Sequence, residues 1–232
     1  MQPYFFPYAG YFQLIAAVDL MVLVSDFPYL KGGFVNRNRM IVNGVQNWLT
    51  LPVSKASPNK SIEQHQVCLD SSARSKTLQK IRQAYAKAAH LREVMGILEG
   101  GLPPNGSGLA SALWGGLHQC GRALQISTPM QMINACDIAP GSSGEQRVLE
   151  ICRHFGAKEY LNLPGGRALY SPQVFANHGI RLGFIEPEFI AYSQINTLAF
   201  VPKLSILDLL MNVKPSSRPH FLNPLCIDWA GV

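Results

Sequence analysis

Apolar and polar residues alternate in blocks along the chain, and these blocks predict short strands and helices in turn. A helical stretch over 11–17 precedes the apolar run 20–24, which predicts a short buried strand. Apolar stretches flank Asn43-Gly44, a dipeptide typical of a type I′ turn, so a hairpin is expected over 40–53. Further strands are predicted over 62–69, 126–133, 160–163 and 181–185, and a last helix over 205–211.

The middle of the chain has a helical pattern. Leu78, Ile81 and Tyr85 recur at three- and four-residue spacing, and a second helical stretch follows a glycine-rich break over 100–108. Strands that alternate with helices are typical of a layered α/β protein with a partly parallel sheet. We therefore expect an α/β fold with a Rossmann-like sheet, in which 1–71 and 126–212 form the core, 72–125 form a helical insertion and 213–232 form an extended tail.

Composition agrees with a folded cytoplasmic protein. Hydrophobic residues make up 47% of the chain and charged residues 15%, which is enough apolar surface for a core. The longest apolar runs, 14–18 and 20–24, are far shorter than the roughly 20 residues of a transmembrane helix. The N-terminus has no basic segment followed by an apolar one, so no signal peptide is expected. The five cysteines form no CxxC pair and the histidines no HxxxH pair, so neither a metal nor a cofactor is expected.

The net charge of +6 comes largely from two basic clusters, over 31–39 and 74–92. The second cluster is interpreted as a solvated helix face, and the first as an anion site for a phosphate or a nucleotide sugar. The chain contains no RRM, KH, helix-turn-helix or zinc-finger pattern, so nucleic acid is not an expected partner.

The N-terminal segment is rich in aromatic residues and prolines. Pro7-Tyr8-Ala9-Gly10-Tyr11 is similar to the loop of adenylyltransferase-type folds, in which His-x-Gly-His opens a helix that faces phosphates. Tyrosines stand here in place of the histidines, and a phenol cannot supply the charge of an imidazolium. This nucleotidyltransferase-like loop would bind a phosphate without transferring a nucleotide, and the alternative is an aromatic wedge in the core.

Polar residues gather after the strand 20–24, at the end of a strand where α/β sheets bind ligands. A carboxylate, an ammonium, a guanidinium and amides within thirteen residues can bind a sugar diphosphate, and the alternative is a polar loop that caps the sheet. His65 follows a second polar loop near the same cleft. The candidate bases are Asp26 and His65, and the candidate substrate-binding residues are Gln2, Tyr8, Tyr11, Tyr29, Lys31, Asn36, Arg37 and Asn38.

Three segments resemble the WbqC-like protein family. They are QPYFFPYAGYFQLI over 2–15, NRNR over 36–39 with WLTLPV over 48–53, and LSILDLL over 204–210; GAKEYL over 156–161 is a weaker match. Ser25-Asp26 departs from the family, which tends to have paired aspartates there. Family members usually carry a short strand before the Gln-Pro motif, and here Met1 stands directly before Gln2, so that strand is missing from the sequence or the native start lies upstream.

The resemblance implies a role in surface-polysaccharide, or O-antigen, biosynthesis. It also implies acyl or aminoacyl transfer to the amino group of a nucleotide-linked amino sugar, with an acyl or aminoacyl donor as second partner. In this hypothesis Asp26 or His65 removes a proton from the amine, and Arg37 and Lys31 hold the diphosphate. The alternatives are a non-catalytic nucleotide-sugar binding protein and a degenerate nucleotidyltransferase.

Overall fold

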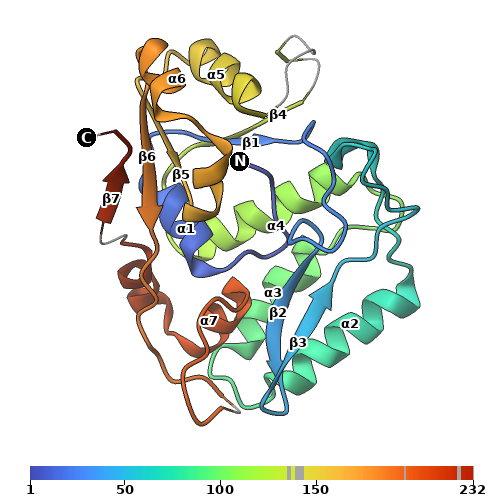
Figure 1. Cartoon of the computed structure of the whole chain (residues 1–232). Coiled ribbons are helices and arrows are strands. Elements are labelled where there is room, and N and C mark those ends of the chain that lie inside the picture. The colour runs from blue at the N-terminus through green and yellow to red at the C-terminus, as the bar shows by residue number, and fades with distance from the viewer. Residues whose placement is uncertain (135–136, 139–143, 196, 224–225, 232) are drawn as a thin grey trace.

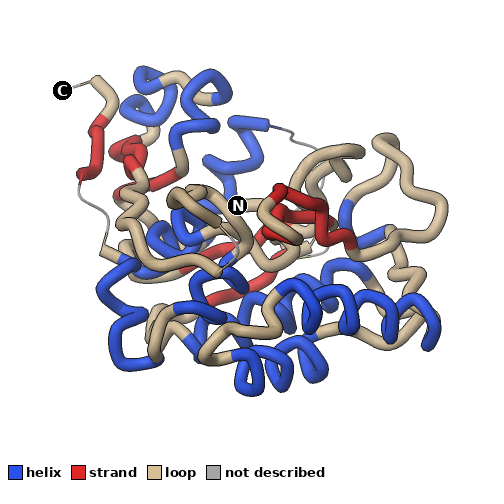
Figure 2. Tube along the Cα trace, turned by 90° about the horizontal axis from the view of Figure 1, so that it is seen from below, coloured by secondary structure: helices blue, strands red, loops and turns tan. Residues whose placement is uncertain are grey.

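The chain is a mixed α/β protein. Its structure is a computed structural model that describes all residues except 135–136, 139–143, 196, 224–225 and 232. Helices surround short strands in both views (Figures 1 and 2), so the predicted α/β class is confirmed. The α-helices are α1 (Ala9–Ala16), α2 (Ser71–Ala84), α3 (Leu91–Gly101), α4 (Leu109–Ala123), α5 (Gly144–His154), α6 (Pro172–Asn177) and α7 (Ile206–Asn212).

The strands of the described residues are divided among three small sheets, and the expected single Rossmann-like sheet is not seen. β1 (Met21–Val24) pairs in parallel with β4 (Met130–Ile133). β2 (Arg37–Val42) and β3 (Val45–Thr50) form an antiparallel hairpin. In the third sheet, β5 (Glu159–Asn162) is parallel to β6 (Arg181–Glu186), which pairs with the antiparallel β7 (Cys226–Trp229).

The hairpin confirms the predicted turn. Asn43 and Gly44 have φ angles of 51° and 79°, and Val42 pairs directly with Val45. Both central residues of a type I′ turn need positive φ, which asparagine and glycine adopt most readily. Turn chemistry thus fixes the register of the hairpin and decides which side chains share a face.

The prediction of a strand over 62–69 is wrong. Ile62–Gln64 instead forms a short 3₁₀ helix, η1. Ser61 and Gln64 form a capping box, in which the Ser61 backbone N–H donates to Oε1 of Gln64 at 2.9 Å. This local bonding satisfies backbone groups that a strand would have paired with a neighbour.

The helical segment 72–125 shares its core with the rest of the chain. Buried side chains of α2, α3 and α4 belong to one hydrophobic cluster with those of α1, β1 and α7. The Phe6 ring of the N-terminal loop packs beside Gly101 of α3 and Gly116 of α4, at 3.7 and 3.5 Å from the positions that a Cβ would take. The predicted helices are therefore present, and they pack against the N-terminal loop rather than around a core of their own.

The C-terminal tail is not the extended segment that the sequence suggested. Pro215–Leu222 forms a 3₁₀ helix, η3, and β7 joins the third sheet. Arg218 of η3 is completely buried, which anchors the tail to the helical core. None of the helices in the described ranges is long and apolar enough to cross a membrane.

Candidate functional site

The two loops expected to form the site lie side by side. Nε2 of Gln2 donates to the carbonyl of Pro28 at 3.2 Å. The backbone N–H of Phe5 donates to the carbonyl of Val35 at 3.0 Å. The N-terminal aromatic loop is therefore held against the polar loop that follows β1.

Half of the eight predicted substrate-binding side chains are buried and bonded within the protein, namely Tyr11, Tyr29, Asn36 and Asn38. The Tyr29 hydroxyl donates to Oδ1 of Asn36 at 2.7 Å, and Nδ2 of Asn36 donates to the carbonyl of Leu51 at 2.8 Å. The Tyr11 hydroxyl donates to the carbonyl of Gln2 at 2.7 Å, and burial raises the pKa of this phenol well above its usual value. These three side chains build the scaffold, and their polar groups are already in use.

Asn38 also serves the scaffold, because it holds the backbone of Phe6 in a strained conformation. Phe6 has a φ angle of 40°, in the left-handed region that a bulky residue seldom adopts. Its carbonyl accepts hydrogen bonds from Nδ2 of Asn38 at 3.0 Å and from the Ser205 hydroxyl at 2.8 Å. These two bonds from distant segments hold the N-terminal loop in its bent conformation.

His65 is buried with both ring nitrogens bonded. Nδ1 donates to the carbonyl of Ser61 at 2.7 Å, and Nε2 accepts from the backbone N–H of Ser57 at 3.1 Å. The partners fix the neutral tautomer, and the lone pair on Nε2 is occupied. The ring also packs on Tyr29, with centroids 4.6 Å apart. This geometry gives His65 a structural role and does not favour it as a general base.

Asp26 lies in a largely buried ion pair with Arg147 of α5. Nη2 of Arg147 is 2.5 Å from Oδ2 of Asp26, and the two side chains are 3% and 14% exposed. The other carboxylate oxygen, Oδ1, is buried and has no hydrogen-bond partner among the described residues. Sequence reasoning did not single out Arg147. The catalytic role of Asp26 remains a prediction.

An exposed surface of aromatic rings and guanidinium groups lies on the outer face of the hairpin. Arg37 and Arg39 are two residues apart on β2 and share a face, and the register places Trp48 directly opposite Arg39. Cζ of Arg37 lies 4.0 Å above the Trp48 ring, and Cζ of Arg39 lies 6.0 Å from the Phe34 ring. Phe34 is 5.9 Å from Trp48 and 6.4 Å from Tyr4. We call Tyr4, Phe34, Arg37, Arg39 and Trp48 the aromatic–arginine face.

The aromatic–arginine face combines open ring surfaces with fixed positive charge. Trp48 and Phe34 are 42% and 40% exposed, although both are large apolar side chains. Nε and Nη2 of Arg37 donate to the carbonyls of Gly33 and Gly32, and Nη1 has no acceptor among the described residues. The Trp48 ring and the glycine carbonyls therefore hold this guanidinium in place with one edge free for an anion. Lys31 is exposed in the same loop.

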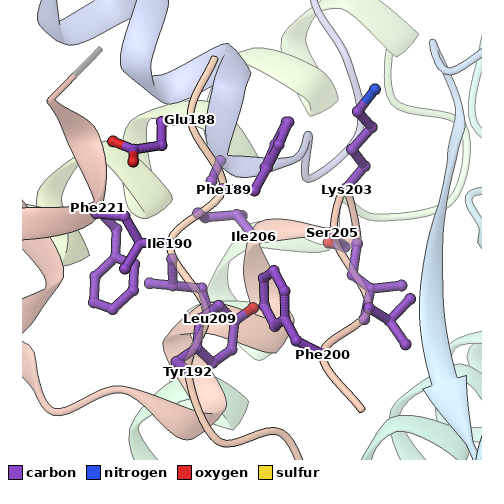
Figure 3. A pocket seen from close by; sticks show the side chains of 13 residues that line it. Glu188, Phe189, Ile190, Tyr192, Phe200, Lys203, Ser205, Ile206, Leu209 and Phe221 are labelled. Atoms are coloured by element: carbon purple, nitrogen blue, oxygen red, sulfur yellow. The ribbon is translucent and has the colours of Figure 1, made fainter. Parts of the chain in front are cut away.

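Tyr8 contacts the aromatic ring of Phe189. Its ring is 6.0 Å from that of Phe189, beside a hollow between the start of α1 and the segment 188–206 (Figure 3). Glu188 and Lys203 are the charged residues of this hollow. Its interior of about 20 Å³ has room for about one water molecule, so it does not suit a nucleotide. Burial raises the pKa of Tyr8 to about 12, so the phenol is neutral near pH 7.

Across the described parts of the chain, no group of three or more His, Cys, Asp or Glu side chains is arranged to hold a metal ion.

Comparisons with known proteins agree with the resemblance seen in the sequence. The chain is 29% identical over 227 residues to a protein of Mycobacterium tuberculosis (strain ATCC 25618 / H37Rv) named uncharacterized protein Rv1507c, covering 96% of this chain and 95% of the relative. No solved structure matches the chain. Residues 2–220 match the model of the WbqC-like protein family. Because that match spans nearly the whole sequence, the chain belongs to the WbqC-like protein family.

Proposed function

We propose that this chain binds a nucleotide-linked amino sugar at the aromatic–arginine face and transfers an acyl or aminoacyl group to its amine, in surface-polysaccharide biosynthesis. The observation that carries the binding part is the exposed stack of Arg37 on Trp48 beside Phe34 and Arg39. An exposed tryptophan offers a flat surface for a nucleoside base or a sugar ring. The two guanidinium groups beside it offer charged donors for a diphosphate.

Electrostatics supports the same ligand class. A diphosphate carries about two negative charges, and a planar guanidinium binds phosphate oxygens in pairs, which an ammonium cannot do. The chain carries a net charge of +6, which favours the approach of an anion. We assign the main phosphate contact to Arg37, because its stack on Trp48 is shorter than the distance from Arg39 to Phe34.

Arg37→Ala is expected to weaken binding of a UDP- or dTDP-linked amino sugar roughly ten- to a hundredfold, since a charged hydrogen bond contributes about 1.5–3 kcal/mol. Arg37→Lys should restore only part of this affinity, and Trp48→Ala should weaken binding through the lost ring surface. Isothermal titration calorimetry with a panel of nucleotide sugars measures these effects.

The chain offers a matched control for the Arg37 variant. Arg181 also stacks on a tryptophan, with its Cζ 3.8 Å above the ring of Trp229, but it lies in the third sheet. Arg181→Ala and Arg92→Ala, in the second basic cluster, should leave the affinity unchanged. Equal losses for all three alanine variants would show a diffuse effect of net charge. No loss for Arg37→Ala would show that the stack only stabilises the hairpin.

The transfer step is tested separately. Asp26 is the remaining candidate base because Oδ1 has no partner in the described residues, whereas both nitrogens of His65 are bonded. Incubation with an amino-sugar nucleotide and acyl or aminoacyl donors should yield an acylated product by mass spectrometry. Asp26→Asn should abolish turnover and retain affinity, with thermal unfolding used to check that the variant is folded. Binding without any product would support the non-catalytic alternative.

A further inference from the structure

Positive charge is concentrated in one short part of the chain. Residues 27–62 contain five basic residues and no aspartate or glutamate: Lys31, Arg37, Arg39, Lys55 and Lys60. The whole chain has 20 basic and 14 acidic residues, so everything outside this segment contributes 15 basic and 14 acidic ones. Nearly all of the net charge of +6 therefore lies in the segment 27–62, which forms the polar loop after β1, the hairpin and the loop before η1.

The cations of this segment are not neutralised by the rest of the fold. Within the described part of the chain, none of the five forms an ion pair with a carboxylate. Arginines outside the segment differ, because five of them pair with a glutamate or an aspartate: Arg82, Arg147, Arg167, Arg181 and Arg218. The segment therefore presents charge of one sign to solvent, which attracts an anionic partner.

Large apolar side chains are exposed in the same segment. Of the six that are exposed among the described residues, four lie within 27–62, namely Leu30, Phe34, Val45 and Trp48. Leu30 is 54% exposed and directly precedes Lys31, and Phe34 is 40% exposed. Exposed apolar side chains beside cations without carboxylate partners are the combination that binds at the surface of an anionic membrane.

Two neighbouring turns carry part of this exposed surface. In the turn 30–33 the N–H of Gly33 donates to the carbonyl of Leu30 at 3.0 Å, and in the turn 57–60 the N–H of Lys60 donates to that of Ser57 at 3.4 Å. The N–H of Tyr29 donates to the carbonyl of Lys60 at 2.9 Å, so the two turns lie side by side. Their exposed residues, which we call the turn pair, are Leu30, Lys31, Pro58, Asn59 and Lys60.

Buried side chains beneath the turn pair hold both turns in place. The Tyr29 hydroxyl donates to Oδ1 of Asn36 at 2.7 Å, and Nε2 of His65 accepts from the N–H of Ser57 at 3.1 Å. The rings of Tyr29 and His65 also pack on each other, with centroids 4.6 Å apart. The turns are therefore preorganised, so docking them on a partner costs little conformational entropy.

We propose that the turn pair docks the chain on the surface of a membrane that contains anionic lipids. Leu30 enters the boundary between headgroups and acyl chains, while Lys31 and Lys60 remain at the level of the lipid phosphates. A protein partner fits less well because lysine is depleted at protein interfaces, and a nucleic acid offers no apolar layer for Leu30. The proposal stands apart from the sugar site, since Leu30 and Lys60 lie outside the aromatic–arginine face.

Co-sedimentation with lipid vesicles tests this proposal. The chain should bind vesicles in which about one third of the phosphatidylcholine is replaced by phosphatidylglycerol, and bind pure phosphatidylcholine vesicles much more weakly. Lys60→Gln should weaken binding to the anionic vesicles roughly fivefold, which is the contribution of one cation at such a surface. Leu30→Ser should also weaken it roughly fivefold, through the lost apolar contact. The double variant should bind roughly 25-fold more weakly than the parent protein.

The matched control changes the same residue types elsewhere on the surface. Leu169→Ser combined with Lys87→Gln removes an exposed leucine and an exposed lysine outside 27–62, and it should leave vesicle binding unchanged. Salt separates the two contributions. At about 1 M NaCl, where charges are screened within roughly 3 Å, the deficit of Lys60→Gln should disappear and that of Leu30→Ser should remain.

Equal vesicle binding by the two double variants would overturn the proposal, and so would equal binding of the parent protein to neutral and anionic vesicles. Binding of single-stranded RNA in place of vesicles, lost in the Leu30→Ser and Lys60→Gln double variant, would overturn it in favour of a nucleic acid. Calorimetry without vesicles keeps the sugar site separate, because this double variant should retain the affinity of the parent protein for a nucleotide sugar. Thermal unfolding checks that both double variants are folded.

Discussion

Arg218→Met is expected to lower the free energy of unfolding by about 3 kcal/mol, although methionine retains much of the side-chain volume. Arg218 is completely buried and makes a bidentate ion pair with Glu93 of α3, at 2.6 and 2.9 Å. Its Nε donates to the carbonyl of Val213 and its Nη2 to that of Leu210, both at 3.0 Å. Methionine donates nothing, so buried carbonyls of the segment after α7 would lose their partners. Urea unfolding measures the change.

Arg82→Met is the matched control for this substitution. Arg82 pairs with Glu99 at 3.3 Å, but the two side chains are 61% and 53% exposed. An exposed pair contributes about 0–1 kcal/mol, so this variant should be close to the parent protein. Similar losses of unfolding free energy for both variants would show that burial of Arg218 does not strengthen its ion pair with Glu93.

The Glu93 pair also predicts a pH effect with a definite sign. The hydrogen bond from Arg218 lowers the pKa of Glu93 below its usual value. A carboxyl group with a lowered pKa in the folded state stabilises the fold above its unfolded pKa, and this contribution is lost as the pH falls through the folded pKa. The difference in stability between the parent protein and Arg218→Met should therefore narrow below about pH 4.

The sequence predicted those parts of the fold that depend on neighbours along the chain. The hairpin was found because Asn43-Gly44 adopts positive φ at both turn positions. The division into three sheets was not predicted, because β6 pairs with β5 and β7, which are separated from it by whole helices. The ordered tail was missed for the same reason, since the partner of Arg218 lies 125 residues away.

In the candidate site, too, local sequence reasoning could find some residues, whereas the roles of others depend on tertiary packing. Arg37 was predicted as a substrate-binding residue from its basic cluster, and Trp48 could have been found by the same kind of reasoning. Counting outward from the pair Val42 and Val45 places Arg39 opposite Trp48, on the face that Arg37 shares. The roles of Asn36, Asn38 and His65 could not be predicted, because their partners are backbone groups placed by tertiary packing.

Asp208 illustrates how a side chain in the family segment 204–210 can be central to the fold without facing a ligand. It is completely buried on α7 and accepts three side-chain hydrogen bonds. The donors are the Tyr85 hydroxyl at 3.0 Å, the Tyr192 hydroxyl at 2.8 Å and Nε2 of Gln194 at 2.8 Å. Tyr192 also lies on the wall of the small hollow, where its ring packs against Phe200 (Figure 3). Asp208 thus ties together α7, the end of α2 and the segment after β6.

Asp208→Ala is expected to lower the free energy of unfolding by roughly 3–5 kcal/mol, because three buried donors lose their acceptor and each costs about 1–3 kcal/mol before water enters. Asp208→Asn should cost less stability, since its amide oxygen still accepts from two of these donors.

Burial raises the pKa of Asp208, so the carboxyl stabilises the fold below its unfolded pKa, and this contribution is lost as the pH rises through the folded pKa. The Asn variant does not titrate, so its deficit in stability relative to the parent protein should shrink as the pH rises above about 4, the usual pKa of an aspartate. Asp19→Ala, at an exposed position, is the control and should change little. Equal stability of Asp208→Ala and Asp19→Ala in urea would show that the three bonds do not hold these segments together.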